Sequence, residues 1–327
     1  MKVARLYGVG DVRIVEEPAP AAGPGHSLVR TTAVGLCGSD LHWFAEGGIG
    51  DAVLRRPLVL GHEFAGVVEA GPLRGHRVAV DPAIPCGACA RCLEGNPNLC
   101  PTIRFAGHGD TDGGLRELLA WPDELLHPLP DGISDAGGAM LEPLGVAIHC
   151  LDLAKVRLGA AVAVVGCGPI GLMVVALARA AGASAVVAVE PREHRRAAAL
   201  AMGATAALSP ADAKGADLEA DVAFEVAGNN EAVELALLAA RPGARVILAG
   251  IPDDDRTTFS ASVARRKGLT LKLVRRMKHV YPRAIALARD GVVDVESLVT
   301  DRYPLSETAA AMAAAVDRGG LKTVVEL

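Results

Sequence analysis

The cysteines of this chain have a spacing that suits metal binding. Four of the seven crowd into one Gly- and Pro-rich stretch with the pattern C-x2-C-x2-C-x7-C, formed by Cys86, Cys89, Cys92 and Cys100. Four thiolates can close a tetrahedron around zinc and leave no position for a substrate, so we predict a structural zinc. An iron–sulfur cluster and a zinc module that grips nucleic acid are the competing interpretations. Because the number of cysteines is odd and four of them are clustered, they do not indicate a disulfide framework.

A second set of candidate ligands comes earlier in the chain. Cys37 lies in Gly35–His42, and His62 and Glu63 follow about twenty residues later. Thiolate, imidazole and carboxylate are ligands that zinc accepts, and a catalytic zinc keeps three protein ligands and one open position. Each residue alone also has a simpler interpretation: Cys37 as a small buried side chain, His62 as a core histidine and Glu63 as a surface charge.

The stretch 161–190 predicts a dinucleotide site. A short apolar run, Ala161–Val165, is followed at once by the Gly-x-Gly-x-x-Gly turn of Gly166–Gly171 and then by an apolar helix. These glycines allow a tight turn, close approach of the backbone to a pyrophosphate, and close packing of the helix on the strand. The N-terminus of the helix also binds anions favourably. Glu190 ends the next strand, where a carboxylate accepts hydrogen bonds from a ribose. Since it would repel a 2′-phosphate, we expect NAD rather than NADP.

A transmembrane helix is the alternative interpretation of this stretch, because residues 160–178 are almost uncharged and long enough to span a bilayer. Three glycines, a proline and a second strand pattern argue against it. Beyond Glu190 the pattern alternates between strand and helix, with a short segment at 209–220 that predicts a trimmed crossover. The expected elements are helices 193–202 and 231–240, a turn at 241–244, and strands 205–208, 221–226, 245–250 and 269–274. Six strands with short connections predict an α/β fold with a doubly wound parallel sheet.

The segments before and after the parallel sheet predict further strands and helices. Residues 1–35 alternate apolar and polar side chains between Pro and Gly, which predicts antiparallel strands and a β-rich first domain. A helix is expected at 140–151. After the parallel sheet we expect helices at 282–289 and 307–316 and a final strand at 323–327.

Composition limits the class of protein. The 327 residues are enough for two domains, and the net charge of −5 gives no reason to expect nucleic acid or a membrane surface as partner. The acidic balance also counts against a nucleic-acid-binding zinc module. Residues 1–10 show no apolar signal-peptide core, so we expect a cytoplasmic protein.

Taken together, these motifs resemble the zinc-dependent medium-chain dehydrogenases, close to the sorbitol (polyol) and threonine dehydrogenase branch. The resemblance covers nearly the whole chain. It rests on the four-cysteine stretch and on Cys37-Gly-Ser-Asp-Leu-His42, Gly61-His62-Glu63, Leu141-Glu142-Pro143-Leu144 and Gly166-x-Gly168-Pro-Ile170-Gly171. It implies a GroES-like catalytic domain at 1–147 carrying the structural-zinc lobe at about 86–100, a Rossmann NAD-binding domain at 148–280, and a return to the catalytic domain at 281–327.

The resemblance also implies roles for single residues. Cys37, His62 and Glu63 would hold the catalytic zinc, and Glu142 would be an auxiliary ligand, with a carboxylate favoured at a helix start as the simpler interpretation. Ser39 and His42 would pass a proton from the substrate to solvent, although Ser39 could be an ordinary turn serine and His42 a support for the metal. The cofactor-binding residues would be Gly166, Gly168, Ile170, Gly171, Glu190 and Arg195; Arg195 could equally be a solvated helix residue. Arg276 matches an arginine of the active-site cleft.

The reaction expected from these residues is oxidation of a secondary alcohol by NAD and the reverse reduction. Zinc would act as a Lewis acid on the substrate hydroxyl, and lowering its pKa from about 16 toward 7 is worth roughly 12 kcal/mol. Trp43, Met277 and His279 replace more polar residues of polyol dehydrogenases, so a less hydroxylated substrate, a cyclitol or an amino alcohol is as plausible as sorbitol.

Two other functions stay open from the sequence. The first is a zinc-free quinone or enone reductase of the same superfamily, which would not need the complete ligand set. The second is a non-catalytic NAD-binding protein. The resemblance implies a homodimer or homotetramer, in line with the general preference for closed symmetric oligomers.

Overall fold

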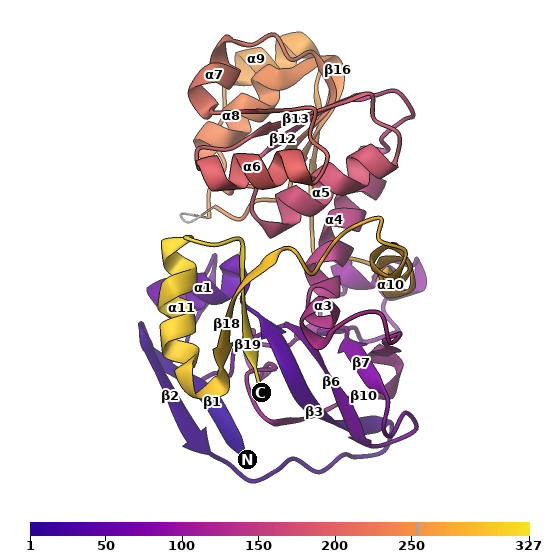
Figure 1. The fold of residues 1–327 in the computed structure, drawn as a ribbon, viewed down its shortest axis with the longest axis vertical. Coiled ribbons are helices and arrows are strands. Elements are labelled where there is room, and N and C mark those ends of the chain that lie inside the picture. The colour runs from indigo at the N-terminus through magenta and orange to yellow at the C-terminus, as the bar shows by residue number, and fades with distance from the viewer. Residues whose placement is uncertain (253–254) are drawn as a thin grey trace. The chain divides into compact units, whose positions relative to one another are not determined.

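A computed structural model describes residues 1–252 and 255–327 (Figure 1). The described chain forms two compact units. The first comprises Met1–Pro143, Tyr281–Arg289 and Val295–Leu327, and the second comprises Leu144–Val280 and Asp290–Asp294. The first unit is therefore assembled from three separate pieces of the chain.

The main sheet of the first unit has the strand order β11-β7-β6-β3-β19-β18, with β10 also paired to β3. Its pairs are antiparallel except for the parallel pair of β18 and β19. The chain thus returns after the second unit to place β19 directly beside β3. The strands are β3 (His26–Gly35), β6 (Glu63–Ala70), β7 (Arg77–Val80), β10 (Leu118–Pro122), β11 (Leu126–Pro128), β18 (Val299–Pro304) and β19 (Lys322–Glu326).

Smaller strand pairs complete the β structure of this unit, as the alternating sequence predicts. They are the antiparallel pairs of β1 (Lys2–Gly8) with β2 (Asp11–Glu16), β4 (Gly48–Ile49) with β5 (Ala52–Val53), and β8 (Ala83–Ile84) with β9 (Arg104–Phe105).

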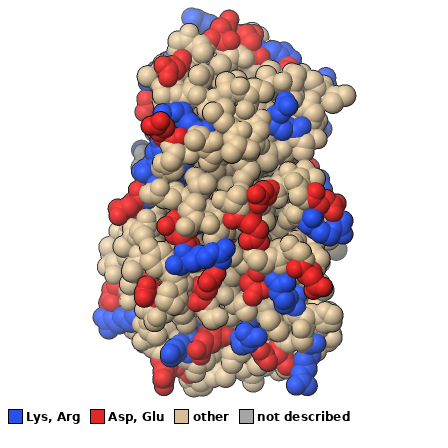
Figure 2. Space-filling model, in the orientation of Figure 1, with Lys and Arg blue, Asp and Glu red and all other residues tan. Residues whose placement is uncertain are grey.

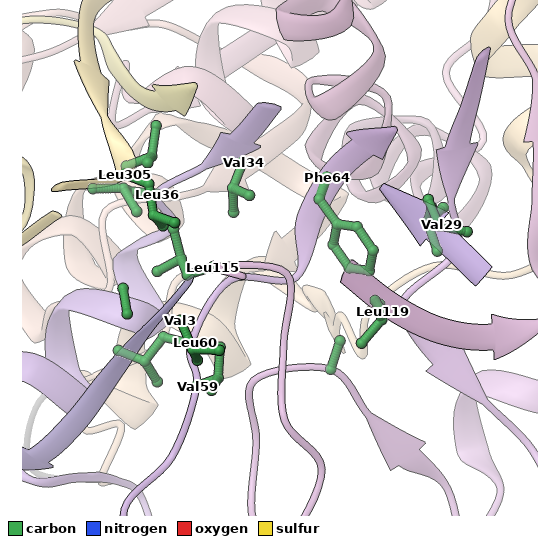
Figure 3. Close-up of a cluster of buried hydrophobic side chains, with 14 of the residues drawn as sticks. Val3, Val29, Val34, Leu36, Val59, Leu60, Phe64, Leu115, Leu119 and Leu305 are labelled. Carbon is green, nitrogen blue, oxygen red and sulfur yellow. The ribbon is translucent and has the colours of Figure 1, made fainter. Parts of the chain in front are cut away.

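The core of the first unit is built by alternation along its strands (Figure 3). Val29 and Val34 on β3 and Phe64 on β6 are almost completely buried, and Leu60 and Leu115 join them from the connecting loops. The ring of Phe64 meets that of Trp121 edge to face, with centroids 6.2 Å apart. Burying a side chain of this size contributes roughly 1.5–3 kcal/mol. This packing fixes the start of β6, where two of the predicted metal ligands lie.

Helices of the first unit are short. The α-helices are α1 (Gly38–Glu46), α2 (Ala90–Leu93), α3 (Asp135–Ala139), α10 (Tyr281–Arg289) and α11 (Thr308–Asp317), with 3-10 turns η1 (Pro97–Leu99), η2 (Asp123–Leu125) and η3 (Leu305–Glu307). The sequence patterns predict α10 and α11 but not α1 or α3. Both of these helices begin within Gly- or Ser-containing segments, where local sequence favours turns, and the four-residue α2 in the cysteine-rich stretch is not predicted either.

The second unit contains the predicted doubly wound sheet. Its six parallel strands have the order β14-β13-β12-β15-β16-β17, so the fold class is confirmed. The order reverses between β12 and β15, which is where ligands bind in such sheets, outside the carboxyl ends of the strands. The strands are β12 (Ala161–Val165), β13 (Ala185–Val189), β14 (Ala206–Leu208), β15 (Ala220–Glu225), β16 (Ala240–Leu248) and β17 (Thr270–Leu273).

The connecting helices of the second unit mostly follow the predictions. They are α4 (Leu141–Ala154), which spans the boundary between the units, α5 (Pro169–Ala180), α6 (Glu193–Ala201), α7 (Pro210–Gly215), α8 (Asn230–Ala239) and α9 (Ala261–Lys267). The six residues of α7 form the trimmed crossover, whereas α9 is not foreseen. The predicted turn at 241–244 lies inside β16, because the pairing with β15 jumps from Ala240 to Arg245.

The alternative of a transmembrane helix at 160–178 is wrong. These residues divide between β12, the glycine turn and α5, which has only 12 residues. Among residues 1–252 and 255–327, no helix has the length and apolar character needed to cross a bilayer. On the face shown in Figure 2, acidic and basic side chains are interspersed rather than gathered by sign.

Candidate metal and cofactor sites

The four cysteines of residues 86–100 converge in the first unit. Their sulfur atoms all lie within 4.8 Å of one another, with 3.5 Å between Cys89 and Cys92 and 4.0 Å between Cys86 and Cys92. A zinc ion with Zn–S bonds of about 2.3 Å requires sulfur atoms roughly 3.8 Å apart. The cluster therefore has the donor type and the spacing that a tetrahedral zinc requires.

Backbone geometry prepares these sulfurs to be thiolates. The amide of Cys89 donates to the sulfur of Cys86 at 3.3 Å, and the amide of Cys86 donates to the sulfur of Cys100 at 3.4 Å. Amide hydrogen bonds from Ala88 and Cys89 lower the pKa of Cys86 to about 6, whereas burial and its thiol neighbours raise the pKa of Cys92 to about 12. Four thiolates repel one another, and a divalent cation would remove that repulsion.

The second predicted ligand set also comes together. The sulfur of Cys37, a ring nitrogen of His62 and a carboxylate oxygen of Glu63 lie within 4.8 Å of one another. Cys37 immediately precedes α1, His62 immediately precedes β6, and Glu63 is the first residue of β6. The pairing of β3 with β6 aligns Gly35 with Glu63 and so brings the two segments together. A side chain at Gly35 would collide with the Glu63 carboxylate, so glycine is needed there.

Asp40, which the sequence analysis does not single out, ties the two ligand segments together. Its side chain is fully buried and accepts hydrogen bonds from the amides of Cys37 at 2.9 Å and Gly61 at 3.1 Å. It also lies 3.4 Å from Nδ1 of His62. Because Asp40 faces Nδ1, the other ring nitrogen, Nε2, is left for a metal. Burial alone would raise the pKa of Asp40, but His62 and the two amides outweigh it and lower that pKa.

Lys322 is a second residue that sequence reasoning missed. Its ammonium group pairs with Oε2 of Glu63, and the side chains are only 4% and 1% exposed. Burial would lower the pKa of Lys322, but Glu63 and Cys37 raise it, so the lysine stays charged. The sequence signal that could have found it is weak, a lysine at the start of the terminal strand just before the apolar pair Val324 and Val325; a buried ammonium group there requires a partner.

Glu142 lies in the first turn of α4 and is 4% exposed. Burial raises the pKa of its carboxyl group to about 7, with His62 acting in the opposite direction and Glu63 adding to the rise. Its carboxylate is not within the 4.8 Å group, so a direct bond to a metal stays a prediction.

The charges around Cys37, His62 and Glu63 favour the binding of a cation. One thiol and the carboxyl groups of Asp40, Glu63 and Glu142 surround His62 and Lys322. Burial would lower the pKa of His62, but Asp40 and Cys37 raise it well above its usual value. Without a metal, this anionic pocket draws a proton onto the imidazole. A divalent cation would supply the same positive charge.

The two proposed relay residues lie on α1, three residues apart and therefore on the same side of the helix. Ser39 Oγ is 3.5 Å from Nε2 of His62, and Nδ1 of His42 is 3.1 Å from a carboxylate oxygen of Glu46. Trp43, on the same helix, is 2% exposed and packs edge to face on His108 within the hydrophobic core. Trp43, from which the sequence analysis infers a less hydroxylated substrate, is therefore a core residue.

In the second unit, the glycine turn has the predicted geometry. Gly166 has φ 100°, and an added Cβ would lie 2.8 Å from the amide nitrogen of Ala227. A Cβ on Gly171 would collide with the carbonyl of Gly166, so the helix packs directly on the strand end. Gly168 has open space beside it, and residues 168–170, including Ile170, are partly exposed at the start of α5. An anion can reach the backbone at this position.

Glu190 lies against this turn. Its carboxylate, 5% exposed, accepts hydrogen bonds from the amides of Cys167 at 2.9 Å and Arg192 at 3.0 Å. Each carboxylate oxygen keeps a further lone pair for a ribose hydroxyl. Arg195 is 9% exposed and acts electrostatically on Cys167. The alternative that Arg195 is solvated is therefore wrong.

Glu225, at the end of β15, is a further residue that the motifs did not reveal. Its buried carboxylate accepts from the amides of Ala227 at 2.8 Å, Gly228 at 2.6 Å and Gly250 at 3.3 Å. It therefore holds together the loops that follow β15 and β16, and the first of these loops contacts Gly166. The sequence signal that could have revealed Glu225 is a carboxylate at the end of an apolar strand, followed by Val-Ala-Gly.

Arg276 belongs to the second unit and has φ 51°. The adjacent Met277 is 5% exposed, and its sulfur fills the space beside Gly145. Since the metal ligands belong to the first unit, the assignment of Arg276 to the active site stays a prediction.

This combination of a β-rich unit bearing two metal-ligand clusters and a Rossmann unit defines a class of oxidoreductase. The model of the alcohol dehydrogenase GroES-like domain matches residues 23–131, and that of the zinc-binding dehydrogenase matches residues 169–290. The chain belongs to the zinc-dependent medium-chain dehydrogenase family, in its polyol dehydrogenase branch.

Individual relatives match along nearly the whole chain. The sorbitol dehydrogenase of Bacillus subtilis is 34% identical over 326 residues, which cover 95% of this chain and 92% of that protein. The crystal structure of L-idonate 5-dehydrogenase from Escherichia coli superposes with a TM-score of 0.93 at 28% identity, covering 100% of this chain and 98% of that one. A putative zinc-binding dehydrogenase from Sinorhizobium meliloti, bound to NADP, has a TM-score of 0.91 at 30% identity, covering 100% and 99%.

Proposed function

We propose that this protein oxidises a secondary alcohol of a polyol, cyclitol or amino alcohol to the ketone, with NAD as hydride acceptor, and catalyses the reverse reduction. The observation that carries the proposal is the convergence of Cys37, His62 and Glu63 on one point. Its support from relatives is the full-length similarity to a sorbitol dehydrogenase and the structural similarity to an L-idonate 5-dehydrogenase. These names agree on a secondary alcohol within a hydroxylated chain.

The chain's own residues would divide the work at the metal. Cys37, His62 and Glu63 would hold the catalytic zinc, with Glu142 as an auxiliary ligand, and Asp40 would orient the imidazole. When bound, zinc supplies the Lewis acidity that favours a deprotonated substrate hydroxyl. Cys86, Cys89, Cys92 and Cys100 would hold a second, structural zinc that has no open position.

Ser39 and His42 would move the proton. A hydroxyl group can accept one proton while it donates another, and an imidazole can do the same through its two nitrogens. Ser39 is beside His62, and the His42 side chain is 15% exposed, so one residue is near the metal ligands and the other reaches solvent. The hydrogen bond to Glu46 would favour the proton on Nδ1 of His42.

The cofactor would lie on the glycine turn. Gly166, Gly168, Ile170 and Gly171 would line the pyrophosphate, and Glu190 would accept hydrogen bonds from the adenosine ribose, with Arg195 nearby. A 2′-phosphate would face the Glu190 carboxylate, so NAD is the proposed cofactor although a structural relative binds NADP. Arg276 is proposed to contact the substrate.

The decisive experiment combines metal analysis with a substrate screen. We expect two zinc ions per chain and reduction of NAD, faster than of NADP, with at least one secondary alcohol of the panel. Cys37→Ser should lower the catalytic rate at least about 1,000-fold, whereas Cys150→Ala, at a buried cysteine outside both clusters, should stay active. Full activity in demonstrably metal-free protein would instead support a zinc-free reductase, and no turnover with any alcohol would favour a non-catalytic NAD-binding protein.

Assembly and location form part of the same proposal. β17 is an edge strand of the parallel sheet and Leu273 on it is 78% exposed, so this edge offers a surface for a homodimer or homotetramer. All seven cysteines are free, as in the reducing cytoplasm. Sedimentation of the purified protein tests the first statement, and cell fractionation tests the second.

A further inference from the structure

A cavity of about 360 Å³ lies in the second unit at the edge where its parallel strands begin. It is bounded by the segment that precedes β12 and by the first residues of β15, β16 and β17. Its lining residues include Lys155, Arg157, Asp221, Arg241, Arg245 and Thr270. Gly166, Glu190 and Glu225 lie at or just beyond the other ends of these strands, about 15 Å away at 3.3 Å per residue. The cavity is therefore separate from the proposed dinucleotide site.

The charged side chains of this cavity are mostly cationic. Four basic residues converge there with one carboxylate, Lys155 and Arg157 from the segment before β12 and Arg241 and Arg245 from β16, although the chain as a whole has more acidic than basic residues. The carboxylate, Asp221, is already engaged: it accepts from Nε of Arg241 at 2.7 Å and from the amide of Ala161 at 2.8 Å. Within the described chain, Lys155, Arg157 and Arg245 have no carboxylate partner within ion-pair distance.

The end of α4 accounts for only part of this charge. Arg245 donates to the carbonyl of Ala154 at 3.3 Å, in the last turn of the helix. A helix C-terminus carries about half a negative charge. Four cations against one carboxylate leave an excess of three positive charges, so about 2.5 stay uncompensated after the helix is included. Like charges held around a small cavity repel one another, and a bound anion would relieve that repulsion.

We propose that this cavity binds a small organic anion carrying two phosphate groups, or one phosphate and one carboxylate. A phosphate monoester carries about −1.5 to −2 at neutral pH, so one phosphate leaves the cavity positive, a phosphate with a carboxylate comes closest to balancing it, and two phosphates neutralise it with a small negative excess. The arginines offer forked donors that fit phosphate oxygens, and the lysine adds a mobile point charge. The volume is at the small end of ligand pockets, which suits a metabolite rather than a polymer.

Isothermal titration of the full-length protein, held at saturating NAD so that the glycine turn is occupied, tests this site. Fructose 1,6-bisphosphate serves as the two-phosphate probe and inorganic phosphate as the one-phosphate probe. We expect the bisphosphate to bind at least tenfold more tightly than phosphate, and its affinity to fall as sodium chloride is raised. The double variant Lys155→Ala/Arg157→Ala should weaken bisphosphate binding at least tenfold, with alcohol oxidation unchanged.

Arg266→Ala is the matched control, since Arg266 is an exposed arginine of the same unit that does not line the cavity. It should bind the bisphosphate as the wild type does. Arg157→Glu, at an exposed position, gives a second variant and should abolish binding. The proposal is overturned if the wild type binds neither probe, if the double variant binds as tightly as the wild type, or if Arg266→Ala loses as much affinity. Equal affinity for both probes would overturn the requirement for two anionic groups. None of these outcomes depends on the alcohol dehydrogenase activity.

Discussion

Replacing Lys322 by methionine should make the first unit depend on its metal for stability. The ammonium group of Lys322 is the cation paired with the buried carboxylate of Glu63. Methionine has a similar volume and no charge, so the change removes the charge and little else. In metal-free protein, Glu63 then loses its partner while it stays buried. Breaking a buried ion pair in this way typically costs 3–5 kcal/mol of unfolding free energy.

The zinc-loaded protein should lose much less. With a cation bound to Glu63, the cost should approach that of a volume-conserving core change, about 1 kcal/mol. The difference of roughly 2–4 kcal/mol must appear as tighter metal binding, which corresponds to about 30- to 700-fold in the zinc dissociation constant. In a Glu63→Gln background the same lysine substitution should cost only about 1 kcal/mol, because the carboxylate is gone.

Tryptophan fluorescence is the appropriate assay. Trp43 and Trp121 are the two tryptophans of the chain, and both lie in the core of the first unit. Urea unfolding followed by their emission therefore reports on this unit. Each variant is compared with the wild type at the same metal content, so that loss of the four-cysteine zinc cancels. Equal losses in the metal-free and zinc-loaded forms, or a metal-free loss below about 1 kcal/mol, would refute the reasoning.

Three further predictions concern other parts of the molecule. Burial raises the pKa of Asp81 to about 6, so the contribution of this carboxyl group to stability should decrease as pH rises from 4 to 7. Relative to the wild type, Asp81→Asn should therefore gain up to about 3 kcal/mol at pH 7 but nothing near pH 3.5, as urea titrations at both pH values would show. Glu225→Gln should raise the KM for NAD about tenfold with kcat changed less than twofold, because the loops beside the glycine turn loosen; a parallel drop in kcat would contradict a positioning role. Cys92→Ser should reduce the zinc content from two ions to one and lower the urea midpoint, whereas Cys150→Ala should retain both ions by elemental analysis.

The local parts of both units could be predicted from the sequence because their signals are local. A β-branched run followed by glycines at fixed spacing can form few structures other than the β12–α5 turn, and four cysteines within fifteen residues (86–100) can only meet one another. The strand pattern of the Rossmann unit was equally readable, since buried parallel strands are short continuous apolar runs. The small helices α1 and α3 carried no such signal.

The residues that the sequence could not supply act across long separations. Asp40 supports His62 from another segment, and Lys322 reaches Glu63 from the opposite end of the chain, so only the pairing of β3, β6 and β19 brings them together. Trp43 directly follows the motif of the first metal ligand, and a less hydroxylated substrate was inferred from it, but the fold places its side chain in the core. Position along a motif predicts which residues are near a site, whereas packing decides which way each one faces.

The order in which the pieces of the first unit are made has a consequence for biosynthesis. β18 and β19 are translated only after the entire nucleotide-binding unit, which is nearly continuous and can fold while synthesis proceeds. Until then β3 lacks its neighbour on one side and the carboxylate of Glu63 lacks its lysine. A nascent chain on the ribosome would thus hold an unfinished, strongly anionic pocket, and stable capture of the metal would wait for the last strand to arrive.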